Sequence, residues 1–598
     1  MLGALGQVLN SLHFGPHERK VKRYLNEATQ DSVLEDLKIA LAPRIKEVQH
    51  LWITFDAYCV EDYSHQRYWN VISFREYIEK KHPDVANSEA VVQLLWRCFL
   101  YFAYHPFPCD ATDSSKVDSS GFQRAVSLLA VQGTDILGTQ DEGEYFWRHD
   151  CAFFRRADFQ RLFRSISLPE GPNNQPTDPS LEEDVMDILA MTQPQSVSLA
   201  PSQDQLGPAS RKLLSESPVR TGCRVTRKDL STLLSLLLRL RLHKAKWGSY
   251  FHFGTFDKSE PVVERLADIL VKGLGGDYNG EKLGSEHLLR AMGLLPNLNQ
   301  RFHQLWTVLF QPPMAADNQI LSQVPEPVGA VSGGIIGAIT LFIPHPKFPT
   351  STRATMQDAR ITLEKQTQRP DDLTVTRLVK TLENNAYPHL MLLTSDATTT
   401  PATVVGAYFP GPLWLKANGK DMREFKTGTS HLLFQLEPQF RLLRWTCPNI
   451  PLTDIINTHE EELSLEAIAA SDKTPPTSNK VYWIGDPERT GPGLQIDPVA
   501  RSALLTSNFT DANVGVAWYN DVGRHSDRGD KIPKKHWEVT VKLGQLNFFR
   551  LSCGLDADLA TGRIIRAKDQ ARYMREAMKT RIAGEDLKKR ISGFGSTT

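Results

Sequence analysis

Apolar residues in the first part of the chain recur every three or four positions, which is the period of an amphipathic α-helix. Val33, Leu37 and Leu41 share one such face. Residues 89–104 (EAVVQLLWRCFLYFAY) are apolar nearly all round, as expected of a helix that is buried on every side. We therefore assign residues 1–167 to a helical domain.

The helical period returns in residues 226–310, where Thr226–Lys246 is predicted to form one long helix. After about Ser332 the period changes to two, the alternation expected of β-strands. The strand-like runs are GAITLFIP, HLMLLTSD, TVVGAYFPG, SHLLFQL, FRLLRWT, VYWIGD, GLQID, VGVAWYN and HWEVTVKLGQLNFFRL, and RLVKTLENN is expected to be a helix between strands. The pattern predicts an α+β protein with a helical N-terminal half and an antiparallel β-sandwich over residues 332–555.

Two stretches rich in Pro, Ser, Gln and Asn interrupt these patterns. Residues 168–225 carry too little apolar surface to offset the entropy cost of ordering, so they are predicted to be a disordered insert. Within them, residues 181–192 (LEEDVMDILAMT) place apolar side chains on one helical face and form either a short docking helix or no structure; the composition favours the second. Residues 311–331 are predicted to be a linker.

The last segment, residues 556–598, is predicted to be a basic helix and tail. From Thr561 onward it has ten Lys or Arg residues and four Asp or Glu residues. A narrow apolar stripe is formed by Ala567, Ala571, Met574, Met578 and Ile582. Such a helix either docks on its own β domain or presents a basic amphipathic face to an external partner.

Length, charge and cysteine content limit the classes of protein to which the chain can belong. The 598 residues suggest two to four domains, and 69 basic residues balance 69 acidic ones, which gives no global case for nucleic-acid binding. The seven cysteines are scattered without a C-x-x-C pair, so a zinc cage or a disulfide framework is not expected and a reducing cytosol fits. The sequence shows no transmembrane run and no secretory signal, and Leu2 stands where N-myristoylation needs glycine.

Motifs that usually carry catalysis are incomplete in this chain. Residues 275–285 approach a phosphate-binding loop, but Glu281 separates the glycine from Lys282, and a connection between helices is expected instead. HEEEL at residues 459–463 lacks the second histidine of a zinc protease helix. The alternative of a hydrolase or redox enzyme would need a site assembled from distant residues, with the candidates His459, Glu460, Cys447 and His525.

Residues 110–122 (DATDSSKVDSSGF) fit the template of a calcium-binding loop in outline. Asp110, Thr112 and Ser114 would take the first three ligand positions, but Ser115 replaces the turn glycine and Gly121 replaces the bidentate acid. A second segment, HQRYWNVISFREYIEKK, has a similar pattern, with Ile72 and Glu76 at the matching positions. We expect EF-hand-like helix pairs that bind no calcium. No metal or other cofactor is predicted.

The stretch VYWIGDPERTGPGLQIDP (residues 481–498) raises the question of a phosphate loop or catalytic elbow. Asp486 and Glu488 have no neighbouring His or Lys to tune their pKa, while Gly491 and Gly493 suit a tight turn. A connection between two strands is therefore the preferred interpretation.

Four segments follow one another in the β-rich region: SHLLFQLEPQFRLLRWT, VYWIGDPERTGPGLQIDP, LLTSNF and HWEVTVKLGQLNFFRL. Their order resembles the TLDc domain family, and the upstream segments SGGIIGAITLFIPHPKFP and PHLMLLTSDATTTPATVVGAYFPGPLW resemble its beginning. The resemblance covers about residues 332–555. The chain departs from the family's pattern at TSNFTDAN, which lacks the usual cysteine, and in a long charged insert at residues 523–533.

The resemblance implies two antiparallel sheets without an established catalytic centre, a role in oxidative-stress resistance, and binding to the peripheral subunits of the vacuolar proton pump (V-ATPase), whose assembly such proteins modulate. With its helical N-terminal half, the chain is similar to two subgroups, the fungal restriction-of-telomere-capping proteins and the EF-hand-like TLDc proteins. In the latter a C-terminal helix helps to hold the pump. The candidate contacts are Asp486, Glu488 and Arg489 in the loop, and Arg572, Met574, Met578 and Arg581 in the tail.

We therefore expect a non-enzymatic, monomeric cytoplasmic adaptor, with possible peripheral association with the vacuolar or lysosomal membrane and no specific nucleic acid as partner. The first alternative is the enzyme with a site built from distant residues. The second is a telomere-capping-related or nucleic-acid-associated factor that binds through the basic tail, for which binding should weaken steeply with salt.

Overall fold

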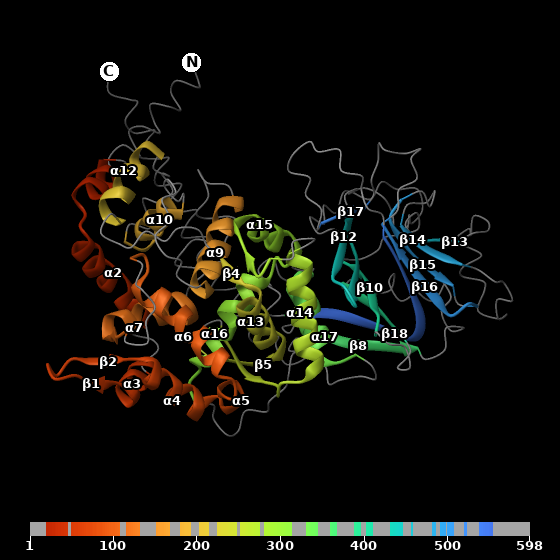
Figure 1. The fold of residues 1–598 in the computed structure, drawn as a ribbon, viewed down its shortest axis with the longest axis horizontal. Coiled ribbons are helices and arrows are strands. Elements are labelled where there is room, and N and C mark those ends of the chain that lie inside the picture. The colour runs from red at the N-terminus through yellow and green to blue at the C-terminus, as the bar shows by residue number, and fades with distance from the viewer. Residues whose placement is uncertain are drawn as a thin grey trace, which may run out of the picture.

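The computed structural model combines helices and an antiparallel sheet (Figure 1). It describes residues 19–45, 50–107, 115–131, 151–167, 180–192, 203–214, 224–247, 251–275, 280–313, 331–344, 359–367, 388–395, 402–410, 431–445, 456–458, 481–485, 491–497, 499–507, 519–522 and 537–553. Within these ranges the helices all precede residue 343, and the large sheet is formed by strands after residue 358. The predicted order of a helical half followed by an antiparallel sheet is confirmed.

Two helix–loop–helix units pack together in the N-terminal third. Their elements are α3 (His50–Tyr58), β1 (Val60–Glu61), β2 (Arg67–Trp69), α4 (Val71–Lys81), α5 (Pro83–Ala86), α6 (Glu89–Tyr104), β3 (Val117–Asp118) and α7 (Ser119–Val126), which η1 (Ser127–Val131) continues as a π-helix. The loops of the two units meet as a short antiparallel ladder, with Tyr68 opposite Asp118 and Trp69 opposite Val117. A fully buried aromatic group fills the space beneath this ladder: Trp69, Phe74, Phe99 and Phe122.

A similar arrangement follows further along the chain. Its elements are α9 (Cys151–Ile166), β4 (Val225–Thr226), α13 (Arg227–Arg239), β5 (Leu240–Trp247), β6 (Phe251–Phe256), α14 (Pro261–Gly275), β7 (Lys282–Leu283), α15 (Ser285–Leu294) and α16 (Leu298–Leu309). Strands β4 and β7 pair as β2 and β3 do. Residues 280–285 connect α14 to α15, as expected, and Lys282 lies in β7 rather than in a phosphate loop.

The prediction of one helix from Thr226 to Lys246 is wrong after Arg239. Residues 240–247 form β5, which pairs with β6 as an antiparallel hairpin. Leu240 and Leu242 are both buried, with Arg241 between them, so the run RLRL satisfies the period of a strand as well as that of a helix. Pairing with β6 decides between the two, because tertiary contacts override weak local propensity.

The prediction of a disordered insert over residues 168–225 is wrong for two segments. Residues 180–192 form helix α10 (Ser180–Thr192), and residues 203–214 form helix α12 (Gln203–Leu214). These helices pack against each other, and α10 also packs against α2 (Gln30–Ile45). Gln30 Nε2 donates a hydrogen bond of 2.7 Å to the carbonyl of Leu213. The helices are ordered because their apolar faces are covered by the N-terminal region, which composition alone does not reveal.

A third correction concerns GAITLFIP, which was predicted to be a strand. It lies in α17 (Gly333–Phe342), which Ser332 caps by accepting a hydrogen bond from the backbone N–H of Ile335. Gly337 faces the backbone of Leu238, where an added Cβ would lie 2.9 Å from the carbonyl oxygen. The helix is buried between α13, α14 and the sheet, so it is apolar all round and shows no helical period.

The sheet is continuous and curled. Its described strands are β8 (Ala359–Thr367), β9 (His389–Ser395), β10 (Val404–Phe409), β11 (Leu432–Glu437), β12 (Arg441–Trp445), β13 (Ile456–Thr458), β14 (Tyr482–Gly485), β15 (Gly493–Asp497), β16 (Ser502–Thr506), β17 (Tyr519–Asp521) and β18 (Glu538–Cys553). Their order is β13-β14-β15-β16-β18-β9-β10-β11-β12-β17, with β8 also paired to β18. The long strand β18 pairs with β16 through residues 538–542 and with β9 and β8 further along, so it links the strands on either side of it into one sheet.

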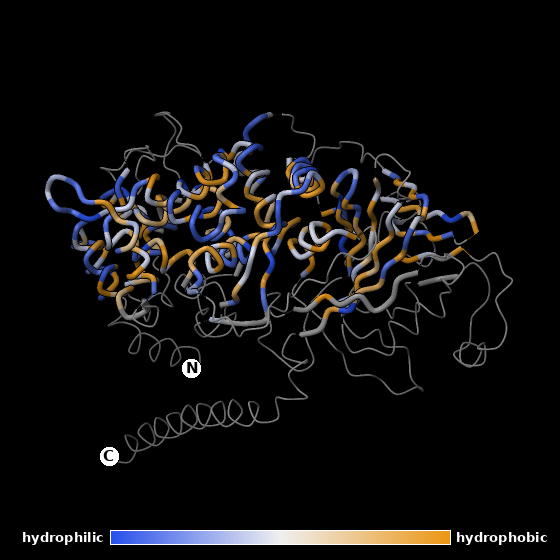
Figure 2. The backbone as a smooth tube through the Cα atoms, turned by 90° about the horizontal axis from the view of Figure 1, so that it is seen from below, coloured by the Kyte–Doolittle hydropathy of each residue, from blue (hydrophilic) through white to orange (hydrophobic). Residues whose placement is uncertain are grey.

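Strand alternation divides the buried residues into two cores. On one face of β9–β12, Leu390, Leu392 and Phe434 join a core that extends through the helices. On the other face, Met391, Leu393 and Leu433 join a second core with residues of β14–β16. Apolar segments accordingly run through the strands in Figure 2. Among the described residues no helix is long and apolar enough to cross a membrane.

Candidate functional site

The loop between α3 and α4 is organised around Asp62. Its Oδ1 accepts hydrogen bonds from the backbone N–H of Ser64 (2.9 Å) and of Gln66 (3.1 Å) and from the Ser64 hydroxyl. Its Oδ2 accepts from Lys116 Nζ at 3.1 Å, and this ammonium group also lies 4.3 Å from the centre of the Tyr68 ring. The Ser64 hydroxyl, followed by Lys116, holds the pKa of Asp62 well below its usual range. A lysine from the second loop thus neutralises the carboxylate of the first.

The expected match of Ile72 and Glu76 to a calcium-loop template is wrong in register. Both residues lie within α4, and Ile72 is 60% exposed. The buried position in the ladder is taken by Trp69, three residues earlier. Because apolar residues recur regularly along α4, the sequence alone does not reveal that the template is displaced by three residues.

The second loop is described from Ser115 onward. Asp118 caps α7 by accepting a hydrogen bond of 2.7 Å from the backbone N–H of Gly121. A Cβ added to Gly121 would lie 3.1 Å from Val117 Cγ1, so the position that holds an acid in a calcium loop has little space for one here. Asp110, Thr112 and Ser114 lie outside the described residues.

A buried ionic cluster joins α10 to α9 and to the end of α6. Arg161 on α9 contacts both oxygens of Asp187 on α10, at 2.7 and 2.9 Å, and also pairs with Asp158. His105 Nε2 lies 2.9 Å from Asp187 Oδ2. Arg164, one turn after Arg161 on α9, pairs with Asp184, one turn before Asp187 on α10. The side chains of these residues are 10% exposed or less.

His105, Asp184 and Asp187 place potential metal-ligand atoms within 4.8 Å of one another. Arg161 already binds Asp187 through Nη1, however, and Arg164 binds Asp184 through both terminal nitrogens; charge-assisted hydrogen bonds of this kind are strong. A cation would have to displace Arg161 and Arg164. We assign the cluster a structural role, which is to hold the insert helix α10 in place.

Electrostatics within the cluster follow from burial and pairing. Burial alone would raise the pKa of Asp187, but Arg161 and His105 outweigh that effect and lower it. Burial raises the pKa of Asp184. Burial also raises the pKa of Glu183 to about 7, an effect that Arg164 and Arg156 offset only in part.

Sequence reasoning missed this cluster, although a signal was present. Arg161 and Arg164 are three residues apart on α9, and Asp184 and Asp187 have the same spacing on α10. Residues three apart lie on one helical face, so the two helices present matching pairs of opposite charge. That match could have identified residues 181–192 as a docking helix.

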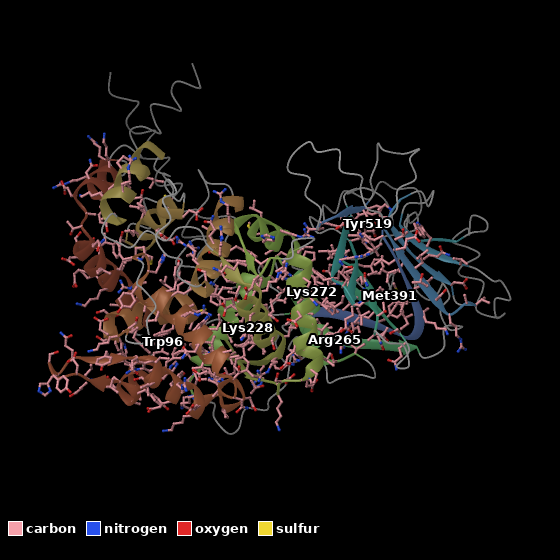
Figure 3. The ribbon with its side chains drawn as sticks, viewed as in Figure 1. Trp96, Lys228, Arg265, Lys272, Met391 and Tyr519 are labelled. Carbon is pink, nitrogen blue, oxygen red and sulfur yellow. The ribbon has the colours of Figure 1, made fainter. Side chains whose placement is uncertain are left out.

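The structure also contains a polar groove of about 1090 Å³ between α5 and α6 on one side and α13 and α14 on the other. Its lining residues are Asp84, Asn87, Ser88, Val91, Arg227, Lys228, Ser231, Thr232, Ser235, Leu236, Arg239, Lys258, Ser259, Glu264, Asp268, Val271 and Lys272. Figure 3 marks Lys228 on α13 and Lys272 on the neighbouring helix α14. Charged and hydroxyl side chains dominate this lining, which makes the groove a candidate binding surface.

The residues proposed from the sequence cannot be placed with these sites. Asp486, Glu488 and Arg489 of the loop, the tail residues Arg572, Met574, Met578 and Arg581, and the enzyme candidates His459, Glu460, Cys447 and His525 all lie outside the described residues. The helix predicted for RLVKTLENN lies outside them as well. Strands β14 and β15, which flank the Asp486 loop, are antiparallel neighbours, as the preferred interpretation of that loop requires.

Comparison of the chain with protein-family models, with curated proteins and with solved structures found no match.

Proposed function

We propose that this chain is a non-catalytic adaptor that binds a large protein assembly, and that the assembly is the peripheral sector of the V-ATPase. The observation that carries the adaptor role is the contrast between the two sites. The buried acid, base and imidazole groups near α10 are occupied by their own ion pairs, whereas the groove between α6, α13 and α14 is lined by polar groups at the surface. Such a protein has a surface for binding, while its buried charges maintain the fold.

The identity of the partner is supported by the TLDc-like order of segments and by two features of the fold. The short ladders β2–β3 and β4–β7 each join two helix–loop–helix units, which is the arrangement expected of degenerate EF-hand pairs. An antiparallel curled sheet occupies the region of the resemblance. We accordingly propose a TLDc-type domain, a role in oxidative-stress resistance, and peripheral association of a monomer with the vacuolar or lysosomal surface through its partner.

The mechanism requires the helical part and the sheet to act as one body. Arg265 on α14 donates a hydrogen bond of 2.8 Å to the buried carboxylate of Glu437 at the end of β11. Phe342 of α17 packs against Phe434 and Phe440. A rigid adaptor that binds one assembly state of the pump more tightly shifts the equilibrium toward that state.

The test is a pull-down from native membranes and cytosol with the tagged full-length chain. We expect enrichment of V-ATPase peripheral subunits. Enrichment should fall in a variant with Arg572→Glu and Arg581→Glu, and a control with Lys20→Glu and Lys22→Glu, which lie on the exposed face of an N-terminal helix, should behave like the unmodified chain. Background levels of pump subunits in all three samples, with the pump intact, would contradict the proposed partner.

A further inference from the structure

The groove carries an excess of positive charge. Five lining residues are basic (Arg227, Lys228, Arg239, Lys258 and Lys272) and three are acidic (Asp84, Glu264 and Asp268), which leaves a net charge of +2. The chain as a whole is neutral, so this excess is a local property of the groove. A surface with such an excess attracts anionic ligands and repels cationic ones.

Hydroxyl groups, rather than the basic residues, bind two of the three acids. Ser231 on α13 donates to Asp268, and Ser259 donates to Glu264 at 3.0 Å. Across the part of the chain that is described, the ammonium groups of Lys228, Lys258 and Lys272 make no hydrogen bond or ion pair, although the backbone carbonyl of Lys228 accepts from the Thr232 hydroxyl. Their ammonium groups therefore remain available to a ligand.

Arg239 adds a fixed positive charge at the opposite end of α13 from Lys228. Its Nε and Nη2 donate to the backbone carbonyls of Asp257 and Asp84, both at 2.7 Å. These acceptors hold the guanidinium in place, and the carboxylates of Asp84, Asp257 and Glu264 also lie near enough to act on its charge. Within the described residues, the groove thus has unpaired ammonium groups at Lys228 and Lys272, and a guanidinium held by backbone carbonyls at Arg239.

Size and lining indicate the kind of anion. At about 1090 Å³ the groove is far larger than a single inorganic ion requires, and it lies just above the range of about 300–1,000 Å³ for small-molecule sites. Small-molecule sites are mostly apolar, whereas this lining includes five hydroxyl side chains: Ser88, Ser231, Thr232, Ser235 and Ser259. Hydroxyls placed between separated positive charges suit an extended peptide, whose backbone offers hydrogen-bonding groups along its length.

We propose that the groove between α6, α13 and α14 binds an acidic peptide segment of a partner protein. Carboxylates of the peptide pair with Lys228 and Lys272 at one end and with Arg239 and Lys258 at the other, while the hydroxyl groups contact its backbone. This inference does not depend on the identity of the partner, and it holds for any assembly that presents an acidic segment.

The test uses a fluorescein-labelled peptide of ten glutamates and the purified full-length chain, with binding followed by fluorescence anisotropy at low and at physiological salt. We expect binding that weakens as salt rises, and a ten-glutamine peptide should bind at least tenfold more weakly. A variant with Lys228→Gln and Lys272→Gln should lose about tenfold in affinity, since each ion pair near a surface contributes modestly. Removing a groove carboxylate with Glu264→Gln should strengthen binding.

The matched control is the double substitution Lys20→Gln and Lys22→Gln, which removes the same charge from an exposed helical surface elsewhere. Circular dichroism confirms that each variant is folded. Equal loss of affinity in the groove variant and in this control would overturn the proposal, because binding would then follow net charge alone. Failure of the unmodified chain to bind the glutamate peptide at low salt would overturn it as well. Neither result depends on the V-ATPase pull-down.

Discussion

At the scale of single residues, the most consequential contact is between Arg161 and Asp187. Both side chains are less than 10% exposed, and the arginine serves a second carboxylate, Asp158. Such a network contributes little net free energy compared with a well-packed apolar core, because each charge is desolvated on folding. Removing one partner is costly, however, since the others remain buried without compensation.

We therefore expect Arg161→Met to destabilise the docking of α10 by about 3–5 kcal/mol. The measurement is urea unfolding together with limited proteolysis within residues 168–225, which should become faster. Arg156→Met is the control, because the Arg156 side chain is 48% exposed and lies 3.6 Å from Glu183; it should cost less than about 1 kcal/mol. Unchanged proteolysis in Arg161→Met would show that the cluster does not hold α10.

Helices α10 and α17 show how single elements depend on their neighbours. Each is a segment whose sequence predicted something else, and each is covered on several sides in the folded chain. For α10 the covering surface includes charges, so its docking should respond to pH. Burial raises the pKa of Glu183 on α10 to about 7.

The sign of this response follows from the raised pKa. Because the pKa of Glu183 is about 7 when folded and 4.5 when unfolded, the unfolded state loses its proton first, and stability falls as pH rises from about 4.5 to about 7. The total loss is roughly 3 kcal/mol. Glu183→Gln cannot ionise, so the difference in unfolding free energy between this variant and the unmodified chain should grow over the same interval. A pH-independent difference in urea titrations would refute the assignment.

At the scale of the whole molecule, helix α14 is one of the elements that join the helical part to the sheet (Figure 1). Arg265 pairs with Glu437, and two turns later the backbone of α14 approaches Phe440 so closely that a side chain at Gly273 would require Phe440 to move. A Cβ at Gly273 would lie 3.0 Å from Phe440 Cδ1. The absence of a side chain at this position allows the helix and the sheet to share one core.

Gly273→Val should therefore weaken the packing between the helical part and the sheet, and this overpacking should lower the free energy of unfolding by about 1–3 kcal/mol. Differential scanning calorimetry should show a lower transition temperature or two transitions in place of one. Gly293→Ala on α15 is the control, since its Cβ would make only an ordinary contact of 3.4 Å with Val522. Equal melting profiles for the two variants would argue against α14 as the joint.

Part of the candidate site could be predicted from sequence. The loop template on residues 110–122 leads into a helix in the structure, where Asp118 is a local cap that acts within three residues, on the N–H of Gly121. The groove could not be predicted. Its lining comes from α5, α6, α13 and α14, and Asp84 and Lys272 are 188 positions apart in the sequence. No local pattern indicates that residues so far apart come together.

The sequence by itself determined the amphipathic helices of the first half and most strands of the second. In an element with a single buried face, the spacing of the apolar residues identifies that face. It also carried the balance of charge and the absence of a complete catalytic motif. Only the tertiary structure decided the state of residues 180–192, 240–247 and 333–342. Residues 333–342 are apolar on more than one face, residues 240–247 fit two periods, and residues 180–192 lie in a stretch that is polar overall. In each case the neighbouring elements select the conformation.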